Sequence, residues 1–289
     1  MPDALNPFVC TIIVPAYNEA ATIGHTLKAL LAEAQADEFD LIVVCNGCMD
    51  DTAAVARAAA PSARVLVLEQ ASKTAALNAG IAAARTSPVV FLDADIITDA
   101  AAVRQLVHRL NWSGADMAYG AARFETSQCS WAVAAFYRAW QQNPYFDKQK
   151  MGGFFTVSRR GLDRLGCLPP VVNDDEYVRR RLLCNSVWVD AAPYKIAAPR
   201  SLASLIKVRS RVYRGNQDLK KDQVLSPGGS RRDRAGQFLG RLLRSPLLWP
   251  GAAIFFLVAI LAHIRNALLR GQVRWEQDKS NRQAGTARG

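Results

Sequence analysis

The sequence predicts an α/β protein with a mostly parallel sheet flanked by helices. Three observations in its first third support this class: short apolar runs typical of buried strands, intervening segments with helical periodicity, and polar clusters that directly follow the strands. The regular alternation of strand and helix implies parallel strands joined by right-handed crossovers. Ligands of such sheets bind at the carboxyl ends of the strands, so the polar clusters mark the expected site.

Each element follows from its local pattern. The strands are short, apolar and rich in β-branched residues, and they are expected at 8–15, 41–45, 64–68, 89–92, 115–124 and 152–157. The helices carry apolar residues three or four positions apart, and they are expected at 20–34, 52–60, 73–85, 99–111, 130–140 and 174–183. The last of the first four strands ends directly before Asp93-Ala94-Asp95. The aromatic residues of 130–140 are interpreted as core packing, with an acceptor-binding wall as the alternative.

The composition is that of an ordinary globular protein. Apolar residues make up 50% of the chain and charged residues 21%, which excludes a disordered or collagen-like polymer. The six cysteines are scattered, so we expect a reducing compartment. Cys45 and Cys48 form a lone CxxC pair, which we interpret as structural or incidental rather than as a zinc site. Residues 1–8 lack the features of a secretory signal.

The net positive charge comes entirely from the second half of the chain. The net charge is +11, and it divides into −4 for residues 1–150, +11 for 151–244 and +4 for 245–289. Such asymmetry favours anionic partners. Diphosphates, phospholipids and nucleic acids all remain open at this point.

A long apolar segment follows the clearest linker, Ser226–Ser230. Residues 247–264 contain no Asp, Glu, Lys or Arg, and 18 residues barely suffice to span a bilayer. Basic residues flank both of its ends, which gives the positive-inside rule no direction. We therefore expect a helix that lies in, or dips into, the membrane interface. A buried helix of a soluble protein is the alternative.

Asp93 and Asp95 are candidate metal ligands. Two carboxylates at a strand end can share a divalent cation, and Mg²⁺ or Mn²⁺ prefers such oxygen ligands while leaving positions for phosphate. A DxD pair alone is weak evidence, because it also occurs in solvated loops. Its place after the fourth strand of an α/β series favours the metal site.

Four motifs together resemble a known family. They occur in order at residues 14–20 (VPAYNEA), 46–52 (NGCMDDT), 72–80 (SKTAALNAG) and 93–95 (DAD). This series resembles the family 2 glycosyltransferases, inverting enzymes of the GT-A fold, over roughly residues 8–215. The resemblance implies a nucleotide-sugar donor, a divalent metal (Mg²⁺ or Mn²⁺) and a catalytic carboxylate in the second half.

The resemblance also implies roles for residues of the first half. Pro15, Tyr17 and Glu19 would line the nucleotide pocket. The family motif after the second strand usually reads Asp-Asp-Gly-Ser, and its second Asp accepts a hydrogen bond from uracil. Asn46 stands in that position, and an amide can accept but can also donate. We therefore expect a UDP-sugar, with a GDP-sugar as the alternative.

Lys73 and the DxD pair complete the expected donor site. Lys73 matches a family lysine near the nucleotide, although a surface lysine that opens a helix is the alternative. Asp93 would face the ribose or the sugar, and Asp95, with Asp93, would hold the metal.

The second half supplies the expected acceptor side. Residues 173–182 (NDDEYVRRRL) resemble the family's Glu-Asp-x-x-Leu-x-x-Arg-Leu motif. Asp174 then takes the Glu position and Asp175 that of the catalytic base, with the choice between them open. An acidic helix N-terminus favoured by the macrodipole is the alternative. The pair Gly152 and Gly153 corresponds to small acceptor-side residues of relatives.

Arg211 and Arg214 are candidates for a bidentate clamp on the donor diphosphate. A solvated basic helix face explains them nearly as well. The Gln-x-x-Arg-Trp motif of related processive enzymes is absent at this point, because the segment reads SRVYRGN. This difference argues against a processive polymer synthase.

The sequence thus predicts a metal-dependent enzyme that transfers a sugar to a hydroxyl of a lipid-linked or glycan acceptor at the cytoplasmic face of a membrane, in polysaccharide or glycolipid biosynthesis. A polyprenyl-phosphate sugar transferase, a non-catalytic sugar-nucleotide binder and a basic nucleic-acid-binding module are the alternatives, and no nucleic-acid partner is expected. The expected regions are 1–225 (catalytic, with a nucleotide-sugar half at 8–125 and an acceptor half at 126–225), 226–245 (basic linker and helix), 246–270 (apolar membrane-associated helix) and 271–289 (polar tail).

Overall fold

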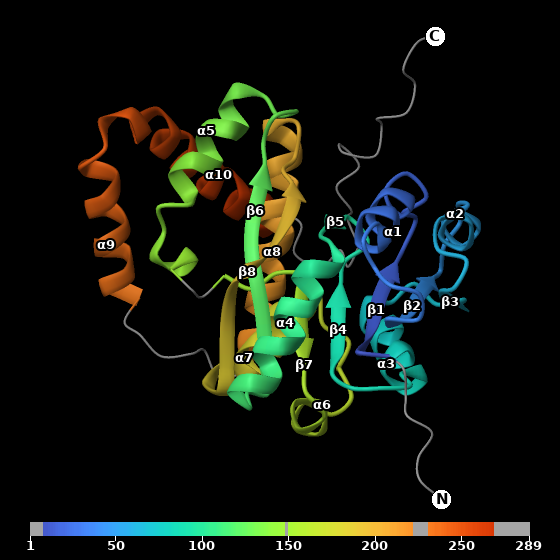
Figure 1. Cartoon of the computed structure of the whole chain (residues 1–289). Helices are drawn as coiled ribbons and strands as arrows, with labels where there is room; N and C mark the ends of the chain where they lie inside the picture. The colour runs from blue at the N-terminus through green and yellow to red at the C-terminus, as the bar shows by residue number, and fades with distance from the viewer. Residues whose placement is uncertain (1–7, 148–149, 222–230, 269–289) are drawn as a thin grey trace, which may run out of the picture. The chain divides into compact units, whose positions relative to one another are not determined.

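The computed structural model describes residues 8–147, 150–221 and 231–268 (Figure 1). The elements of these ranges are, in chain order, β1 (Cys10–Ala16), α1 (Ile23–Leu31), β2 (Phe39–Asn46), α2 (Thr52–Ala59), β3 (Arg64–Leu68), α3 (Lys73–Ala83), β4 (Val89–Leu92), β5 (Ile96–Ile97), α4 (Ala100–Ser113), β6 (Met117–Glu125), α5 (Trp131–Trp140), η1 (Pro144–Phe146), β7 (Phe154–Val157), α6 (Arg159–Leu165), α7 (Asp174–Leu182), η2 (Leu183–Asn185), β8 (Ser186–Ala197), α8 (Leu202–Lys221), α9 (Arg231–Leu243), η3 (Pro246–Leu248) and α10 (Trp249–Leu268).

The chain divides into two compact units that alternate along the sequence. Unit 1 combines the residues up to Arg123 with Met151–Ile196, and unit 2 combines Phe124–Lys150 with the residues from Ala197 onward. The first junction lies close to the expected end of the nucleotide-sugar half at 125. The functional division into halves stays a prediction.

An eight-stranded sheet, with the order β3-β2-β1-β4-β7-β6-β8-β5, runs through the described residues. β1 pairs in parallel with β2 and β4, and β2 pairs in parallel with β3. β7 is antiparallel to both β4 and β6, and β5 is antiparallel to β8. The expected α/β fold is confirmed. Its sheet is mixed, with the parallel part confined to the first four strands of the order.

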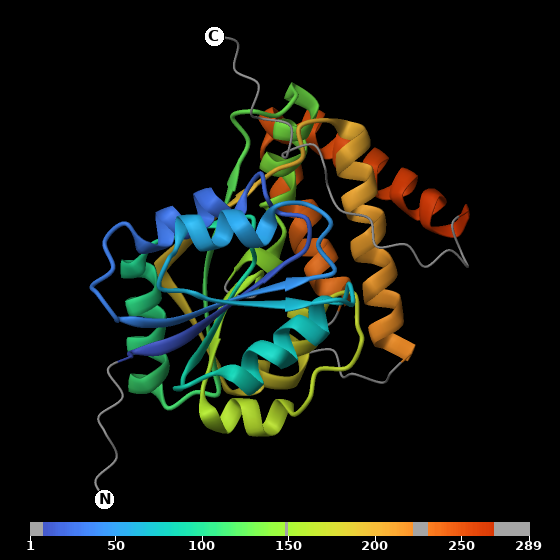
Figure 2. The ribbon, with the colours of Figure 1, turned by 90° about the vertical axis from the view of Figure 1, so that its right-hand side faces the viewer.

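The central strands are buried and mostly apolar because helices cover both faces of this part of the sheet. Every residue of β1, β2 and β4 is buried. Figure 2 shows α1 and α2 on one face and α3 on the other. On the α3 face, a Cβ added to Gly80 would lie 2.5 Å from the Ile13 side chain, so the glycine permits close approach of helix and strand.

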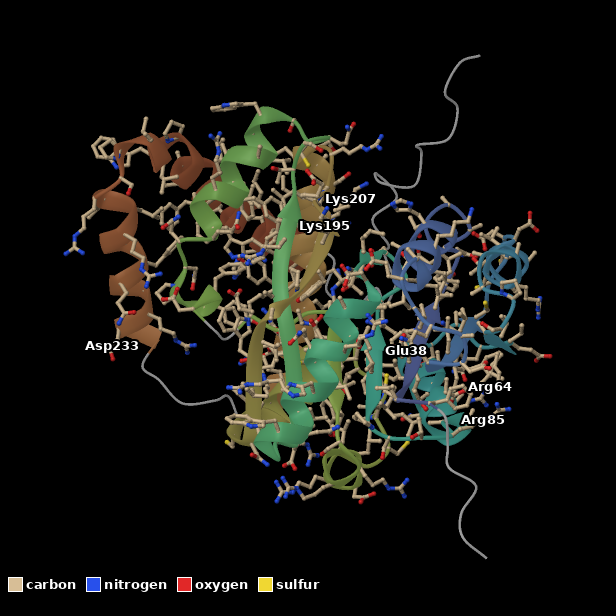
Figure 3. All side chains as sticks on the ribbon, viewed as in Figure 1. Glu38, Arg64, Arg85, Lys195, Lys207 and Asp233 are labelled. Carbon is tan, nitrogen blue, oxygen red and sulfur yellow. The ribbon has the colours of Figure 1, made fainter. Side chains whose placement is uncertain are left out.

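Charged pairs fasten the edges of unit 1. Arg64, labelled in Figure 3, donates to buried Asp40 (2.7 Å). Arg104 donates to Glu38, which is also labelled there, and this bond links α4 to the segment before β2. The bond lowers the pKa of Glu38, against the opposing effect of its burial. These ion pairs stabilise the ends of the sheet where the parallel strands begin. They do not involve the edge where these strands end.

Unit 2 packs α5 against α8 and α10. Val133, Phe136 and Tyr137 of α5 form an apolar cluster with Leu205 of α8 and Val258 of α10. The interpretation of the aromatic segment as core packing is therefore confirmed for Phe136 and Tyr137. The exposed Trp131 lies outside that core.

The expected apolar helix is present as α10. By length and composition, residues Pro246–Leu268 can cross a membrane, with a mean hydropathy of 2.2 and only 22% of the most apolar window buried. The expected linker at 226–230 and the tail at 271–289 lie outside the described residues.

Candidate active site

The carboxyl ends of three parallel strands meet at one edge of the sheet. Ala16 at the end of β1 pairs with Cys45 of β2, and β4 ends at Leu92, one residue after the pair of Ile13 and Phe91. This register brings the polar segments after the three strands to the same edge. The site is built on that edge.

Hydrogen bonds join the loops that follow β1 and β2. They run from Met49 N to Asn18 Oδ1 (2.8 Å), from Ala20 N to Asp50 Oδ2 (3.2 Å) and from Glu19 N to Thr52 Oγ1 (2.8 Å). Glu19 is buried, and its carboxylate accepts the Thr22 hydroxyl at 2.7 Å. Pro15 is also buried, whereas Tyr17 is half-buried. The structure thus gives Glu19 a clear role in ordering the start of α1.

Asn46 is held in a fixed orientation. Its side chain is buried, and Nδ2 donates to the carbonyl oxygen of Ala16 at 2.8 Å. Cys48 Sγ donates to the same carbonyl (3.4 Å), so this cysteine has a structural contact. Gly47 adopts a left-handed φ of +61°, and a Cβ there would lie 2.7 Å from Ala71 N, so only glycine fits this turn.

Lys73 links two carboxylates that are far apart in the sequence. It is the first residue of α3, whose N-cap Ser72 accepts from Ala75 N. Lys73 Nζ lies 2.7 Å from Asp93 Oδ1 and 3.0 Å from Asp174 Oδ1. We call these three residues the Lys73 cluster. It unites the 72–80, DxD and 173–182 motifs at one place in unit 1.

The cluster has an uneven charge balance. Burial by itself would lower the pKa of Lys73, but the carboxylates of Asp174, Asp93 and Asp175 raise it, so the ammonium group stays charged. Burial raises the pKa of Asp174 to about 6. Lys73 opposes that increase, whereas Asp93 and Asp175 add to it. The one lysine therefore faces three carboxylates, and this excess of negative charge suits a divalent cation.

Gly153 fits against Asp93. Its carbonyl oxygen accepts from Asp93 N at 2.8 Å, and a Cβ at Gly153 would overlap the carboxylate of Asp93. Gly152 is buried beside it, and neither glycine is on the surface. The absent side chain at 153 thus makes room for Asp93. The proposed contact of this pair with an acceptor stays a prediction.

Asp175 and Asp95 lie next to the cluster in the sequence. Asp175 is half-buried at the start of α7, and its Oδ1 accepts from Glu176 N at 2.8 Å. Asp95 is exposed two residues beyond Asp93. Within the described ranges, no group of three or more His, Cys, Asp or Glu side chains is arranged to hold a metal. One or two carboxylates with substrate phosphates form a usual Mg²⁺ site, and Asp93 with Asp95 fits that pattern.

Arg211 and Arg214 lie on α8 in unit 2. Arg214 Nε donates to Asn266 Oδ1 of α10 at 3.3 Å, so part of its hydrogen-bonding capacity serves the packing of these two helices. A diphosphate clamp from either arginine stays a prediction.

Asn78 is a site-supporting residue that sequence reasoning did not single out. Its Nδ2 donates to Leu168 O and its Oδ1 accepts from Leu168 N, both at 2.9 Å. These bonds fasten the segment before α7 to α3, the helix that begins with Lys73. Asn78 lay within a recognised motif, but only the fold reveals its partner, which is 90 residues away.

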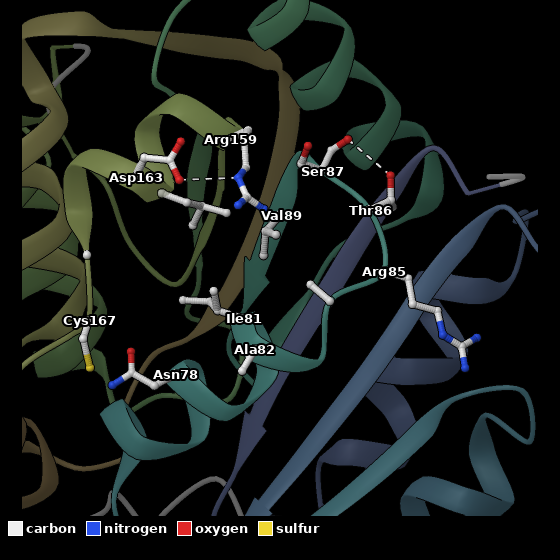
Figure 4. A pocket seen from close by; sticks show the side chains of 13 residues that line it. Asn78, Ile81, Ala82, Arg85, Thr86, Ser87, Val89, Arg159, Asp163 and Cys167 are labelled. Atoms are coloured by element: carbon white, nitrogen blue, oxygen red, sulfur yellow. Dashed lines mark hydrogen bonds and ion pairs between the residues drawn. The ribbon is translucent and has the colours of Figure 1, made fainter. Parts of the chain in front are cut away.

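A hollow of about 760 Å³ lies elsewhere in unit 1, between the end of α3, the start of β4 and α6 (Figure 4). Val89 lines it, so it adjoins the opposite end of β4 from Asp93. Its charged residues are exposed, and Arg159 and Asp163 pair with each other at 3.4 Å. The hollow takes no part in the site.

We predict that kcat/KM rises as the pH increases through about 6. Above this value Asp174 is ionised and paired with Lys73, whereas below it the carboxyl is protonated and the pair weakens. The effect of Asp174 on the free energy of unfolding has the opposite pH dependence. Because the pKa of Asp174 lies above its ordinary value of 3.8, its contribution to stability is complete below pH 3.8 and is lost as the pH rises through about 6.

A pH profile of kcat/KM for the wild type and Asp174→Asn would measure this effect. The variant should lose the acidic limb. A wild-type profile that is flat through this range, or an unchanged limb in the variant, would contradict the prediction.

Comparison with known proteins identifies the family of the chain. The family model "Glycosyl transferase family 2" matches residues 11–159, just over half of the chain. Glycosyltransferase AglD of Haloferax volcanii is 33% identical over 118 residues, which are 38% of this chain and 19% of that protein. The matched part spans 19% to 48% of the first curated relatives.

Solved structures share the fold. The mannosyltransferase PcManGT of Pyrobaculum calidifontis, in complex with GDP-Man and Mn²⁺, has a TM-score of 0.58 at 19% identity over 93% of this chain and 84% of that one. Glucosyl-3-phosphoglycerate synthase of Mycobacterium tuberculosis, with Mn²⁺, UDP-Glc and glycerol 3-phosphate, has a TM-score of 0.54 at 22% identity over 78% and 83%. The chain has the GT-A fold and belongs to glycosyl transferase family 2.

Proposed function

We propose that this chain transfers one sugar, with inversion at the anomeric carbon, from a nucleotide diphosphate-sugar to a hydroxyl of a lipid-linked or glycan acceptor. The observation that carries the proposal is the Lys73 cluster at the carboxyl edge of the sheet. It joins the residue expected to face the donor, Asp93, to the start of α7. The expected base, Asp175, is the next residue of that helix.

The donor base is recognised by Asn46 in this proposal. Because Nδ2 donates to Ala16, Oδ1 remains as the acceptor for a base N–H. Uracil and guanine both carry such a donor. We propose a UDP-sugar, in line with the family resemblance, and keep a GDP-sugar as the alternative.

A divalent cation is proposed at Asp93 and Asp95. The fit rests on oxygen ligands alone and on the excess of carboxylates over lysine in this region. When bound, Mg²⁺ or Mn²⁺ would neutralise the departing diphosphate. Lys73 fixes the Asp93 carboxylate, and Gly153 leaves the space for it.

Asp175 is the proposed base. The acceptor hydroxyl attacks the anomeric carbon opposite the diphosphate, its proton passes to the Asp175 carboxylate, and the bond to the diphosphate breaks. Asp174 is the less accessible of the two residues and is paired with Lys73. We therefore assign Asp174 to positioning Lys73, and Asp175 to the acceptor.

We propose a cytoplasmic membrane face as the place of reaction. Nucleotide-sugars are cytosolic, and the apolar α10 and the basic second half suit an acceptor held in a membrane. A lipid-linked acceptor needs an enzyme that reaches the headgroup region. The basic half then faces anionic lipid rather than nucleic acid.

The test is a thermal-shift panel of UDP-, GDP- and dTDP-sugars, each with and without Mn²⁺. A bound donor at a hundred times its Kd stabilises the native state by about 2.7 kcal/mol. We expect this shift for one UDP-sugar, only with Mn²⁺. No shift from any nucleotide-sugar, together with salt-dependent binding of random oligonucleotides, would overturn the proposal.

A further inference from the structure

Helix α10 has one buried face. Its buried residues Gly251, Val258, Ala262 and Asn266 repeat at seven and four positions and form a single stripe. A Cβ at Gly251 would overlap the backbone oxygen of Ala135 in α5, so the two helices approach closely there. Val258 lies in the apolar cluster shared with α5 and α8. The stripe therefore identifies the side of α10 that packs against the other helices of unit 2.

The other face of α10 is apolar and exposed. We call the exposed apolar side chains of α9, α10 and the connection between these helices the apolar surface. Its members are Leu239, Leu243, Leu247, Trp249, Phe256, Leu257, Ile260, Leu261, Ile264 and Leu268. α9 and α10 touch through Phe238 and Phe255, whose ring centroids are 5.2 Å apart. An exposed apolar patch made by two adjoining helices marks an interaction site.

The charge of the residues around the apolar surface indicates which partner binds there. Residues 234–275 contain no Asp or Glu but six arginines. Arg244 is exposed at the end of α9, and exposed Arg138 lines a hollow of about 250 Å³ with Trp131 and Leu247. Cations and tryptophans beside an apolar face suit anionic lipid headgroups above acyl chains. A second copy of the chain would instead bring arginines against arginines.

Polar contacts hold α10 to α8. Asn266 accepts from Arg214 at 3.3 Å, and its Nδ2 donates to Gln217 at 3.4 Å. The rings of Tyr213 and His263 are 4.3 Å apart. A bilayer-spanning α10 would either break these contacts and expose Asn266 to lipid, or draw the arginines of α8 into the hydrocarbon, and both are unfavourable.

We propose that the apolar surface docks on an anionic lipid bilayer with α10 in the plane of the interface, one face on unit 2 and the other among the outer parts of the acyl chains. The inference deepens the proposed function by stating how the enzyme reaches a membrane-held acceptor. The test of membrane docking needs no sugar transfer. If docking fails, the proposed transferase function can still be measured separately, and the reverse also holds.

The experiment is flotation of the full chain with vesicles of phosphatidylcholine, alone or mixed with phosphatidylglycerol. We expect binding to the mixed vesicles and much weaker binding to phosphatidylcholine alone. The double variant Ile260→Gln, Ile264→Gln should bind these vesicles at least about tenfold more weakly than the wild type does. The matched control, Val67→Gln with Trp112→Gln, removes equally exposed apolar side chains from unit 1 and should bind as the wild type does.

Circular dichroism and the melting temperature of each variant establish that it is folded. Equal binding of both double variants would overturn the proposed surface. If protease added outside the vesicles spares the part of the chain that follows residue 268, α10 spans the bilayer and the in-plane arrangement is overturned. A lipid-free dimer that the Ile260→Gln, Ile264→Gln variant dissociates, without vesicle binding, would assign the surface to a second copy and also overturn the proposal.

Discussion

The Asp175→Asn variant will bind the donor as the wild type does, and its turnover will fall by roughly 10²–10⁴, the usual contribution of a positioned base. Asparagine is nearly isosteric with aspartate but cannot take a proton from the acceptor hydroxyl. Asp175 is half-buried, and the donor contacts are assigned to Asn46, Asp93 and Asp95, so the donor Kd should not change. Steady-state kinetics and calorimetry on the same preparation would measure both quantities.

Two further variants make this test specific. Asp163→Asn changes an exposed acid of unit 1 that pairs with Arg159 and should leave turnover unchanged. If Asp174→Asn is inactive while Asp175→Asn is active, the base is Asp174 and the motif alignment is shifted by one residue. If neither variant loses turnover, the acceptor is a phosphate that needs no base, as in a polyprenyl-phosphate sugar transferase.

The Asp95→Ala variant will lose metal-dependent donor binding. Loss of even an outer partner of a metal site costs roughly 10- to 100-fold in affinity, and a ligand itself should cost at least as much. Asp95 is exposed at the strand end, so its removal should not unfold the sheet. Calorimetric titration of the donor, with and without Mn²⁺, would measure the loss.

Asp190→Ala is the matched control for this change, because that residue is an exposed aspartate of β8 outside the motifs. It should keep the Mn²⁺ dependence of the wild type. An Asp95→Ala variant that binds donor with unchanged affinity in the presence of Mn²⁺ would remove Asp95 from the metal site.

Local patterns predicted the first half of the fold well. The strands at 64–68 and 89–92 have the predicted bounds, and the other predicted strands and helices are present within a few residues. Buried parallel strands and amphipathic helices have periodicities that can be read without knowing their neighbours. The strand-end motifs were locatable for the same reason.

The antiparallel half of the sheet was not predictable in this way. β8 alternates poorly between buried and exposed positions and was not recognised as a strand. The direction of β7 beside β4 depends on the path of the chain, which a short apolar run does not encode. The bounds of the long helix α8 were not predicted either, because its many charged residues indicated only a basic helix face around Arg211 and Arg214.

The residues of the site were predicted, but their contacts were not. Lys73 and Asp93 were expected at the donor site, and Asp174 was expected on the acceptor side. That Lys73 joins the two carboxylates depends on the meeting of α3, β4 and α7, which are separated by up to 101 residues. The reason for glycine at 153 likewise appears only when Asp93 is seen beside it.

The alternation of the two units along the chain has a consequence for biosynthesis. Residues 124–150 leave the ribosome before the α8 and α10 segments that cover Phe136 and Tyr137. At the usual translation rate, Val258 follows these aromatic residues by on the order of ten seconds. During that interval the nascent chain exposes an apolar cluster that is completed only when α10 emerges.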